Sequence, residues 1–357
     1  MKTSIAREDL ARIAQAIAPE AKTLEGKTIL ISGGSGFLGN YFIGAFKELN
    51  KTLLKNPCRV ISIDNFITGS RTALDEKDPQ IKHIEADITK PLNIDEPVDY
   101  IIHAAGLASP FYYKKYPLET IETTIAGAKN LLDLARKKNA KSFLLFSSSE
   151  IYGDPDPRFV PIPETYKGHV SSIGPRACYD ESKRLAETIC MVHHQLYGIP
   201  VKIVRPFNIY GPGMKPDDYR VFPTFITRGL LGNSLPVHGS GVQTRAFCYI
   251  ADAITGFLKV LLSDKNGEIY NVGNDSEELG MEALANLMVE EIGNGAVVQL
   301  IEYPDSYPAD EPQRRCPDIT KIRAQLGYKP TVNLREGIKR SIAWYKEAFP
   351  ERFDVKK

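Results

Sequence analysis

The stretch TILISGGSGFLGNYFIGAFKEL, residues 28–49, decides the fold of this chain. It begins with a short run of β-forming residues, passes through a glycine-rich turn and ends in an apolar pattern of helical period. Gly33, Gly36 and Gly39 stand between the expected strand and helix, where they permit a tight turn and let backbone N–H groups approach a pyrophosphate. This order is typical of a dinucleotide-binding unit. The alternative is a turn that only packs the helix against the strand.

The next β-forming run, RVISID at 59–64, ends on Asp64. A carboxylate at this place accepts hydrogen bonds from the adenosine ribose and repels a 2′-phosphate. We therefore predict NAD, and not NADP, as the cofactor. Asp87, which follows the third expected strand, is a candidate contact for adenine, with an aspartate in an exposed turn as the alternative.

Further apolar runs at 100–105, 142–148 and 201–206 alternate with helical stretches. These repeated strand–helix units predict an α/β fold with a Rossmann-type, doubly wound parallel sheet. After Pro206, prolines and glycines cluster and helices mix with short strands, which indicates a smaller α+β substrate-binding domain. We expect three parts: an N-terminal helical extension (1–24), an NAD-binding Rossmann domain (25–205) and a substrate domain (206–357). Near 246–275 the chain is expected to return to the Rossmann domain.

Composition excludes several classes of function. The 45 Lys and Arg residues nearly balance 44 Asp and Glu, and no basic cluster with interleaved aromatics occurs, so nucleic acid is not an expected partner. The uncharged run 28–46 is broken by five glycines, so no membrane span is predicted. We also predict no metal site, because the histidines and cysteines lack metal-ligand spacing. Five scattered cysteines and the lack of a signal-peptide core indicate a cytoplasmic protein.

Tyr179 and Lys183 lie four residues apart at the start of a predicted helix, on one face. An ammonium near the phenol would lower the pKa of Tyr179 and make it a usable general base. Ser148, at the end of the run 142–148, is expected at the carboxyl edge of the sheet, where it would bond the same substrate hydroxyl. A solvated helix pair is the alternative for Tyr179 and Lys183 taken alone.

Together these motifs resemble the extended short-chain dehydrogenase/reductase family, which acts on nucleotide-activated sugars, over about residues 25–347. Within the family, the chain is most similar to the UDP-glucuronate decarboxylase group. The matching stretches are DNFITG (64–69), ASPFYYKKYP (108–117), SSSEIYGDP (147–155), GHVSSIGPRACYDESKR (168–184), VQTRAF (242–247) and PDITK (317–321).

The resemblance implies an NAD-dependent nucleotide-sugar decarboxylase with tightly held NAD, acting through a 4-keto sugar. It also implies a homodimer formed through two helices at 117–138 and 179–197. The cofactor-binding positions that it implies are Gly33, Gly36, Phe37, Leu38, Gly39, Asp64, Asn65, Phe66, Thr68, Gly69, Asp87, Ile88, Tyr179 and Lys183.

The resemblance also implies the residues that handle the sugar. Ser149 and Glu150 would join Ser148, Tyr179 and Lys183 in catalysis, with Glu150 handling a proton or ordering a water at carbon 5. A glutamate that only bonds a nearby backbone amide is the alternative. The implied substrate contacts are Arg245 and Arg315 for the diphosphate, Asn208 and Arg220 for the nucleotide, and Tyr113 for the sugar.

Other reactions stay open at this point. A 4-epimerase or a 4,6-dehydratase would use the same 4-keto chemistry, although Ser149 replaces the acidic Asp of the best-known dehydratases. A non-catalytic NAD-binding scaffold is the alternative from another class, and it would be expected to lack Tyr179 or Lys183. The chain departs from the decarboxylase pattern at Gly106-Leu107, Tyr219 and Cys316.

Overall fold

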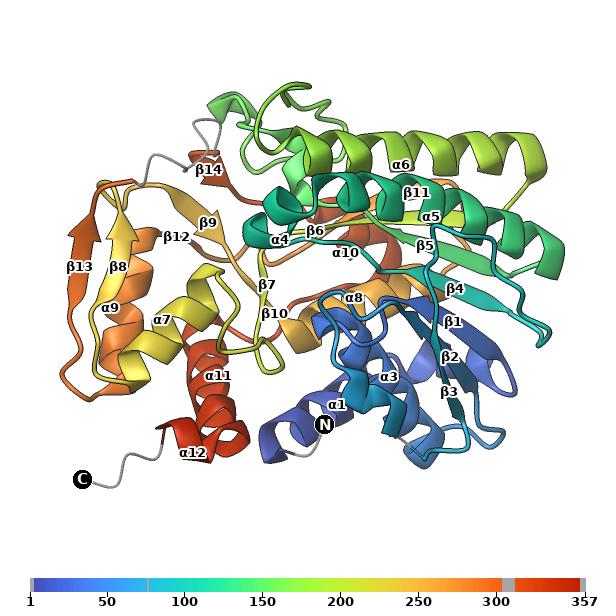
Figure 1. Ribbon diagram of the computed structural model, residues 1–357, viewed down its shortest axis with the longest axis horizontal. Coiled ribbons are helices and arrows are strands. Elements are labelled where there is room, and N and C mark those ends of the chain that lie inside the picture. Colours follow the sequence, from blue (N-terminus) through green and yellow to red (C-terminus); the bar gives the residue numbers. More distant parts are fainter. Residues whose placement is uncertain (1–2, 76, 304–311, 354–357) are drawn as a thin grey trace.

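The computed structural model of the chain describes residues 3–75, 77–303 and 312–353. Over these residues, seven parallel strands form the central sheet in the order β11-β6-β5-β4-β1-β2-β3 (Figure 1). The predicted Rossmann-type doubly wound sheet is thereby confirmed. The strands are β1 (Thr28–Ser32), β2 (Arg59–Asp64), β3 (Ile81–Glu85), β4 (Tyr100–His103), β5 (Ser142–Phe146), β6 (Val201–Pro206) and β11 (Glu268–Val272).

Helices cover both faces of this sheet, as the apolar runs require, because strands buried on two sides need two apolar neighbours. In Figure 1, α5 (Pro117–Lys138) and α6 (Ala177–Tyr197) lie side by side on one face. The opposite face is covered by α3 (Phe37–Thr52) and α8 (Ile250–Leu262), where Phe257 packs edge-on against Phe146 of β5.

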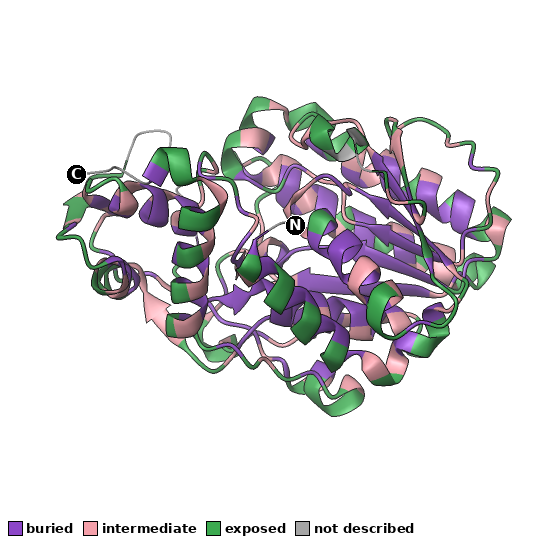
Figure 2. Ribbon diagram, turned by 90° about the horizontal axis from the view of Figure 1, so that it is seen from below, coloured by how far each residue is buried: buried purple, intermediate pink, exposed green. Residues whose placement is uncertain are grey.

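The N-terminal segment forms the predicted amphipathic helix, α1 (Ser4–Ala16), followed by α2 (Ala18–Ala21) and the short 3-10 helix η1 (Lys22–Leu24). The buried face of α1 contacts α3, α8 and α11. Thus α1 covers an edge of the core. Figure 2 shows from below that the central sheet is largely buried between its flanking helices.

In its described residues, the second part of the molecule carries three small sheets. Its β9 (Thr244–Ala246) lies between the antiparallel β12 (Glu278–Gly280) and the parallel β14 (Arg314–Arg315). The other elements after β6 are β7 (Ile209–Tyr210), α7 (Val221–Leu230), β8 (Leu235–His238), β10 (Cys248–Tyr249), α9 (Met281–Ile292), β13 (Val298–Ile301), α10 (Thr320–Leu326), α11 (Leu334–Ala348) and α12 (Pro350–Phe353). The domain boundaries drawn from the sequence stay a prediction.

Two expected strands end earlier than their apolar runs. β4 ends at His103 and β5 at Phe146, and the chain beyond each leaves the sheet at its carboxyl edge. There it forms α4 (Pro110–Lys115) and the 3-10 helix η3 (Ser149–Tyr152); two further 3-10 helices are η2 (Arg71–Asp75) and η4 (Pro157–Phe159). No helix among the described residues is long and apolar enough to span a membrane.

Candidate active site

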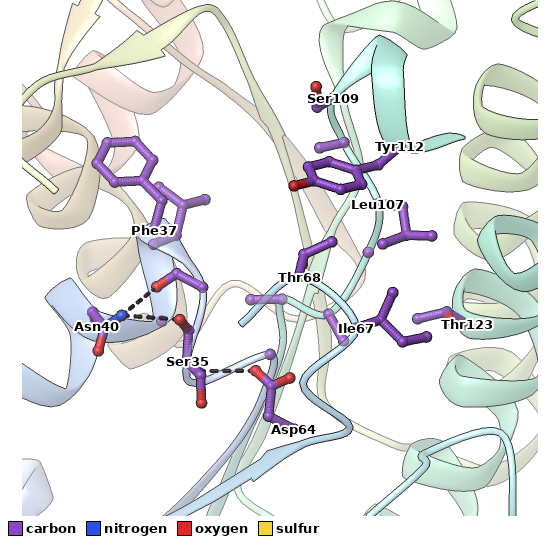
Figure 3. Close-up of a pocket in the computed structure, with 18 of the residues that line it drawn as sticks. Ser35, Phe37, Asn40, Asp64, Ile67, Thr68, Leu107, Ser109, Tyr112 and Thr123 are labelled. Atoms are coloured by element: carbon purple, nitrogen blue, oxygen red, sulfur yellow. Dashed lines mark hydrogen bonds between the residues drawn. The ribbon is translucent and has the colours of Figure 1, made fainter. Parts of the chain in front are cut away.

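The glycine turn between β1 and α3, which carries Ser35 in Figure 3, is shaped by close backbone contacts. Gly33 has φ +76°, and a Cβ there would lie 2.7 Å from the backbone of Ala105. A Cβ on Gly39 would lie 2.3 Å from the Gly33 carbonyl oxygen. Side chains are therefore excluded at both positions, which leaves room for a ligand against the N-terminus of α3.

Asp64 is held in a fixed orientation at the end of β2. Its Oδ2 accepts a hydrogen bond from the Ser35 amide at 3.0 Å, and its Oδ1 accepts one from the Phe66 amide at 2.8 Å. Each carboxylate oxygen can accept a second hydrogen bond, so the group can also receive the two hydroxyls of a ribose. The tight turn at 64–69 includes Gly69, whose added Cβ would lie 2.9 Å from the Ser35 side chain.

A cavity of about 300 Å³ runs along the glycine turn and the carboxyl edge of the sheet. Most of the predicted cofactor positions line it: Gly33, Gly36, Phe37, Leu38, Gly39, Asp64, Asn65, Thr68 and Ile88. The predicted residues that do not line it are Phe66, Gly69, Asp87, Tyr179 and Lys183. Asp87 is exposed and bonds the Thr89 amide at 2.9 Å, as in the alternative interpretation of an aspartate in an exposed turn.

Other cavity residues were not predicted. Ser35 and Asn40 come from the turn and α3, and two further stretches, 104–109 and 213–215, form its far walls. The side chain of Asn40 donates to the carbonyls of Ser35 and Gly36 and so stiffens the turn (Figure 3). Glycines that keep side chains out of the turn and a carboxylate at the end of β2 with free acceptor capacity fit a dinucleotide such as NAD.

The expected catalytic side chains meet at the carboxyl ends of β5 and the start of α6. Tyr179 is 5% exposed and is hydrogen-bonded to the Ser148 side chain, whose Oγ also accepts from the Glu150 amide at 3.2 Å. Lys183 lies one turn further along α6; its Nζ donates to the Phe146 carbonyl at 2.7 Å and sits 5.7 Å from the centre of the Tyr179 ring. The alternative of a solvated helix pair is therefore wrong.

The predicted lowering of the Tyr179 pKa is wrong for this arrangement. Burial raises the pKa of Tyr179 to about 12, and the charges of Glu150 and Asp180 add to the rise, while the Ser148 hydrogen bond opposes it. Burial also lowers the pKa of Lys183 to about 8. The physical reason is that both groups lie in a low-dielectric interior, where each charged form loses its hydration.

Glu150 lies in a buried cluster with two arginines. Its carboxylate accepts two hydrogen bonds from Arg315, at 2.5 and 2.8 Å, and a short one from Arg176. Both arginine side chains are about 95% buried, at 5% and 6% relative exposure. Such paired, charge-assisted bonds fix the position of Glu150 and place two cations beside it. The alternative, a glutamate that only bonds a backbone amide, is not what the structure shows.

Asp180 adds a second carboxylate to this cluster. Its Oδ2 is 3.5 Å from Nε of Arg176, and within the described parts of the chain no donor reaches its buried Oδ1. Burial and then the charge of Glu150 raise the pKa of Asp180 to about 7, against the opposing effects of Arg176 and Arg315. A proton on Asp180 therefore changes the charge of the cluster near neutral pH.

The remaining predicted residues surround these groups at different distances. Tyr113 is buried and stacks on Tyr179, with ring centres 5.4 Å apart. Arg245 pairs in register with Arg315 on neighbouring strands and donates to backbone carbonyls, at 2.8 Å to that of Thr244. The others are placed as follows: Ser149 is buried at the start of η3, Asn208 donates to the Ala246 carbonyl, and Arg220 lines the NAD cavity.

Arg176 and Asp180 received no role from the sequence. Both stand inside the stretch that carries Tyr179, and Arg176 directly precedes α6, which begins at Ala177. The i, i+4 spacing of an arginine and an aspartate was the available signal. No group of His, Cys, Asp or Glu suited to a metal ion occurs in the described part of the chain.

A model of the NAD dependent epimerase/dehydratase family matches residues 29–273. UDP-glucuronic acid decarboxylase 5 of Arabidopsis thaliana is 42% identical over 312 residues, which cover 87% of this chain and 86% of that protein. UDP-glucuronic acid decarboxylase 1 of Xenopus tropicalis is 39% identical over 323 residues, covering 90% of this chain and 72% of that protein.

Solved structures agree in fold. A dTDP-glucose 4,6-dehydratase, DesIV from Streptomyces venezuelae with NAD bound, is 27% identical with a TM-score of 0.79, covering 91% of this chain and 98% of that one. UDP-glucuronic acid 4-epimerase from Bacillus cereus, in complex with UDP-glucuronic acid and NAD, is 28% identical with a TM-score of 0.73, covering 90% and 99%. NAD is the cofactor of this enzyme, and the chain belongs to the NAD dependent epimerase/dehydratase family.

Proposed function

We propose that this protein is an NAD-dependent UDP-glucuronate decarboxylase that forms UDP-xylose through a 4-keto intermediate. The observation that carries the proposal is the buried cluster of Glu150, Arg176 and Arg315 beside Tyr179 and Ser148. Cations next to the acid–base pair suit a sugar that carries a carboxylate one carbon away from the hydroxyl to be oxidised. The identity of about 40% to decarboxylases over most of the chain supports it.

The glycine turn, Asp64 and the cavity walls would hold the cofactor. Bound NAD supplies reversible hydride transfer at carbon 4 of the sugar. Tyr179 takes the proton of the 4-hydroxyl as general base, and Ser148 orients that hydroxyl through the hydrogen bond that it shares with Tyr179. Lys183, one turn further along the same helix, donates to the Phe146 carbonyl at the end of β5 and lies beside the Tyr179 ring, where it helps to hold the catalytic helix against the sheet.

The resulting ketone lies β to the carboxylate on carbon 5, so carbon dioxide leaves readily. The electron pair of the broken bond moves to the 4-oxygen, where Tyr179 and Ser148 stabilise the enolate by hydrogen bonding. Carbon 5 is then protonated, and the ketone is reduced back to the hydroxyl. Glu150 holds Arg176 and Arg315 beside the sugar carboxylate until this group leaves as carbon dioxide. Glu150 also handles a proton or orders a water at carbon 5.

We assign the other contacts on the same grounds. Arg245, next to Arg315 in the β9–β14 pair, faces the diphosphate, and Tyr113 faces the sugar from its stack on Tyr179. Asn208 and Arg220 contact the nucleotide from the second part of the molecule, and Ser149 contacts the sugar near carbon 5. Each assignment predicts a raised KM on substitution by alanine.

We also propose a homodimer formed through α5 and α6. Leu118 on α5 and Leu185 and Leu196 on α6 are 70%, 49% and 67% exposed. Exposed apolar side chains on two adjacent helices favour an isologous contact with a second copy. Light scattering coupled to size exclusion measures the mass: twice that of the chain is expected, and a monomer at micromolar concentration would contradict the proposal.

The test of the function is mass spectrometry of the products formed with NAD from UDP-glucuronate and, separately, from UDP-glucose. Loss of carbon dioxide from UDP-glucuronate is expected, with no change in UDP-glucose. Loss of water from UDP-glucose would identify a 4,6-dehydratase. An isomer of unchanged mass, separated by chromatography, would identify a 4-epimerase and overturn the proposal.

A further inference from the structure

Two walls of the NAD cavity come from distant parts of the chain. Tyr112 of α4 lines the cavity on one side, and the segment 213–220, between β7 and α7, lines it on the other through residues that include Lys215 and Arg220. Figure 3 shows the Tyr112 ring at the edge of the cavity, across from Phe37.

An aromatic pair joins the two walls. Phe111 directly precedes Tyr112, and Tyr219 directly precedes Arg220. The rings of Phe111 and Tyr219 stack with their centres 4.4 Å apart and an interplanar angle of 29°. The two residues are 41% and 64% exposed, so the stack lies at the surface, just outside the cavity that their neighbours line.

The segment 213–220 has two more contacts with the nucleotide-binding part. Nζ of Lys215 donates to the Thr68 carbonyl at 3.3 Å, and both of these residues line the cavity. The Arg220 guanidinium lies 6.0 Å from the centre of the Phe37 ring on α3. Asp218 holds that guanidinium with contacts of 3.0 and 2.6 Å. The segment is therefore attached along its length, and the stack is its attachment to α4.

We propose that Phe111 and Tyr219 form a clasp that closes this cavity and retains NAD as a resident cofactor. The walls must separate before a dinucleotide can leave, and separation breaks the stack and exposes both ring faces to water. Retention suits an enzyme that returns the hydride to its own sugar, because such an enzyme has no need to exchange cofactor between turnovers. The clasp acts on NAD alone, so its test does not require the sugar reaction.

The experiment loads the enzyme with isotopically labelled NAD and measures release after a chase with excess unlabelled NAD. For Tyr219→Ala, the strength of an aromatic pair predicts release about 2- to 10-fold faster than from the wild type. Tyr219→Phe keeps the ring and should release NAD at the wild-type rate. Phe111→Ala tests the same stack from the other wall and replaces Tyr219→Ala if that variant does not fold.

A double-mutant cycle separates a clasp from two independent effects. Phe111→Ala combined with Tyr219→Ala should release NAD no faster than either single variant, because one contact is lost only once. The matched control is Phe159→Ala, since Phe159 is 45% exposed and packs on Tyr166 at 5.0 Å outside the cavity. Wild-type release from Tyr219→Ala, additive single effects, or equal acceleration by the control would each overturn the clasp.

Discussion

Two buried aspartates, each beside an arginine, differ in how completely their carboxylates are bonded. Oδ1 of Asp9 accepts from Arg340 at 2.7 Å, and its Oδ2 accepts from the hydroxyls of Tyr41 and Tyr249 at 3.1 and 2.8 Å. The four residues join α1, α3, β10 and α11. A second carboxylate, that of Glu8, also contacts Arg340, but its side chain is 59% exposed, and the group does not line the cavity.

Asp180 is bonded far less completely. It has one long contact with Arg176, at 3.5 Å, and it faces the like charge of Glu150 while Tyr179 directly precedes it in the chain. A buried charge that is fully bonded serves the fold, whereas one that is left short of partners next to a like charge is typical of a functional site. We therefore assign the Asp9 group to stability and the Asp180 group to chemistry.

The largest expected effect is on catalysis. Tyr179→Phe removes the hydroxyl that exchanges the proton and should lower kcat by about 10²- to 10⁴-fold, because that is the usual contribution of a general base. NAD binding and thermal unfolding should stay as in the wild type, since the ring and its stack on Tyr113 are kept. Steady-state kinetics and a melting curve check both. Retained turnover would remove Tyr179 from the chemistry.

The next effect is on stability alone. Asp9→Ala removes the buried carboxylate from the Arg340 guanidinium and leaves it only the exposed Glu8, so it should cost about 3–5 kcal/mol of unfolding free energy, measured in urea. The matched control is Glu8→Ala, because Glu8 contacts the same arginine at 3.0 Å but is 59% exposed, so its loss should cost at most about 1 kcal/mol. A fall in kcat per folded molecule for Asp9→Ala would break the division between the two groups.

Glu150→Gln tests whether the cluster of Glu150, Arg176 and Arg315 acts in catalysis, whereas Asp9→Ala tests a role in stability. The substitution keeps the shape but weakens the bonds to Arg176 and Arg315, and kcat/KM should fall about 10- to 100-fold, as expected for hydrogen bonds to a charged group. Arg176→Ala in the same background should add little, because the two residues act as a unit. Full activity of Glu150→Gln would show that the cluster serves the fold and has no role in catalysis.

The smallest effect is in the pH dependence of stability. The pKa of Asp180 is raised from 3.8 to about 7, so the folded state binds the proton more tightly than the unfolded state. This contribution to stability is lost as the pH rises from 3.8 to about 7. Asp180→Asn removes the cost of ionising this buried carboxyl in the folded state. Above about pH 7 its free energy of unfolding should therefore exceed that of the wild type by at least about 1 kcal/mol, equivalent to nearly one pKa unit.

The gain from Asp180→Asn should vanish below about pH 4, where the wild-type carboxyl is protonated in both states. Glu181→Gln is the matched control, because Glu181 neighbours Asp180 in the chain but its side chain is 42% exposed. Urea unfolding across this pH range makes the comparison. A gain of the same size at every pH would show that Asp180 does not titrate in the window.

The fold was predictable because its determinants are local. The glycine turn, the strand before it and the helix after it follow each other in 28–49, and the second strand ends on Asp64 as expected. The shapes that glycine alone permits at Gly33 and Gly39 leave few alternatives for this segment. The helix bounds at 117–138 also agree with the structure.

The electrostatics of the site were not predictable in the same way. The sequence places Lys183 near Tyr179, but the pKa of the phenol depends on burial and on carboxylates from η3 and α6, which only the folded chain brings together. The pairing of Glu150 with Arg315 joins residues 165 positions apart. Similarly, α1 shows an amphipathic pattern in the sequence, but nothing local reveals that Asp9 bonds to Arg340.

The measurement that tests the central claim most directly follows UDP-glucuronate by NMR in deuterated water, with wild-type enzyme and with Tyr179→Phe in parallel. The wild type should release carbon dioxide and give UDP-xylose, or its 4-keto form, with deuterium at carbon 5, while the variant leaves the substrate unchanged. A wild-type product that keeps its carboxylate and differs only in configuration at carbon 4 would contradict the account.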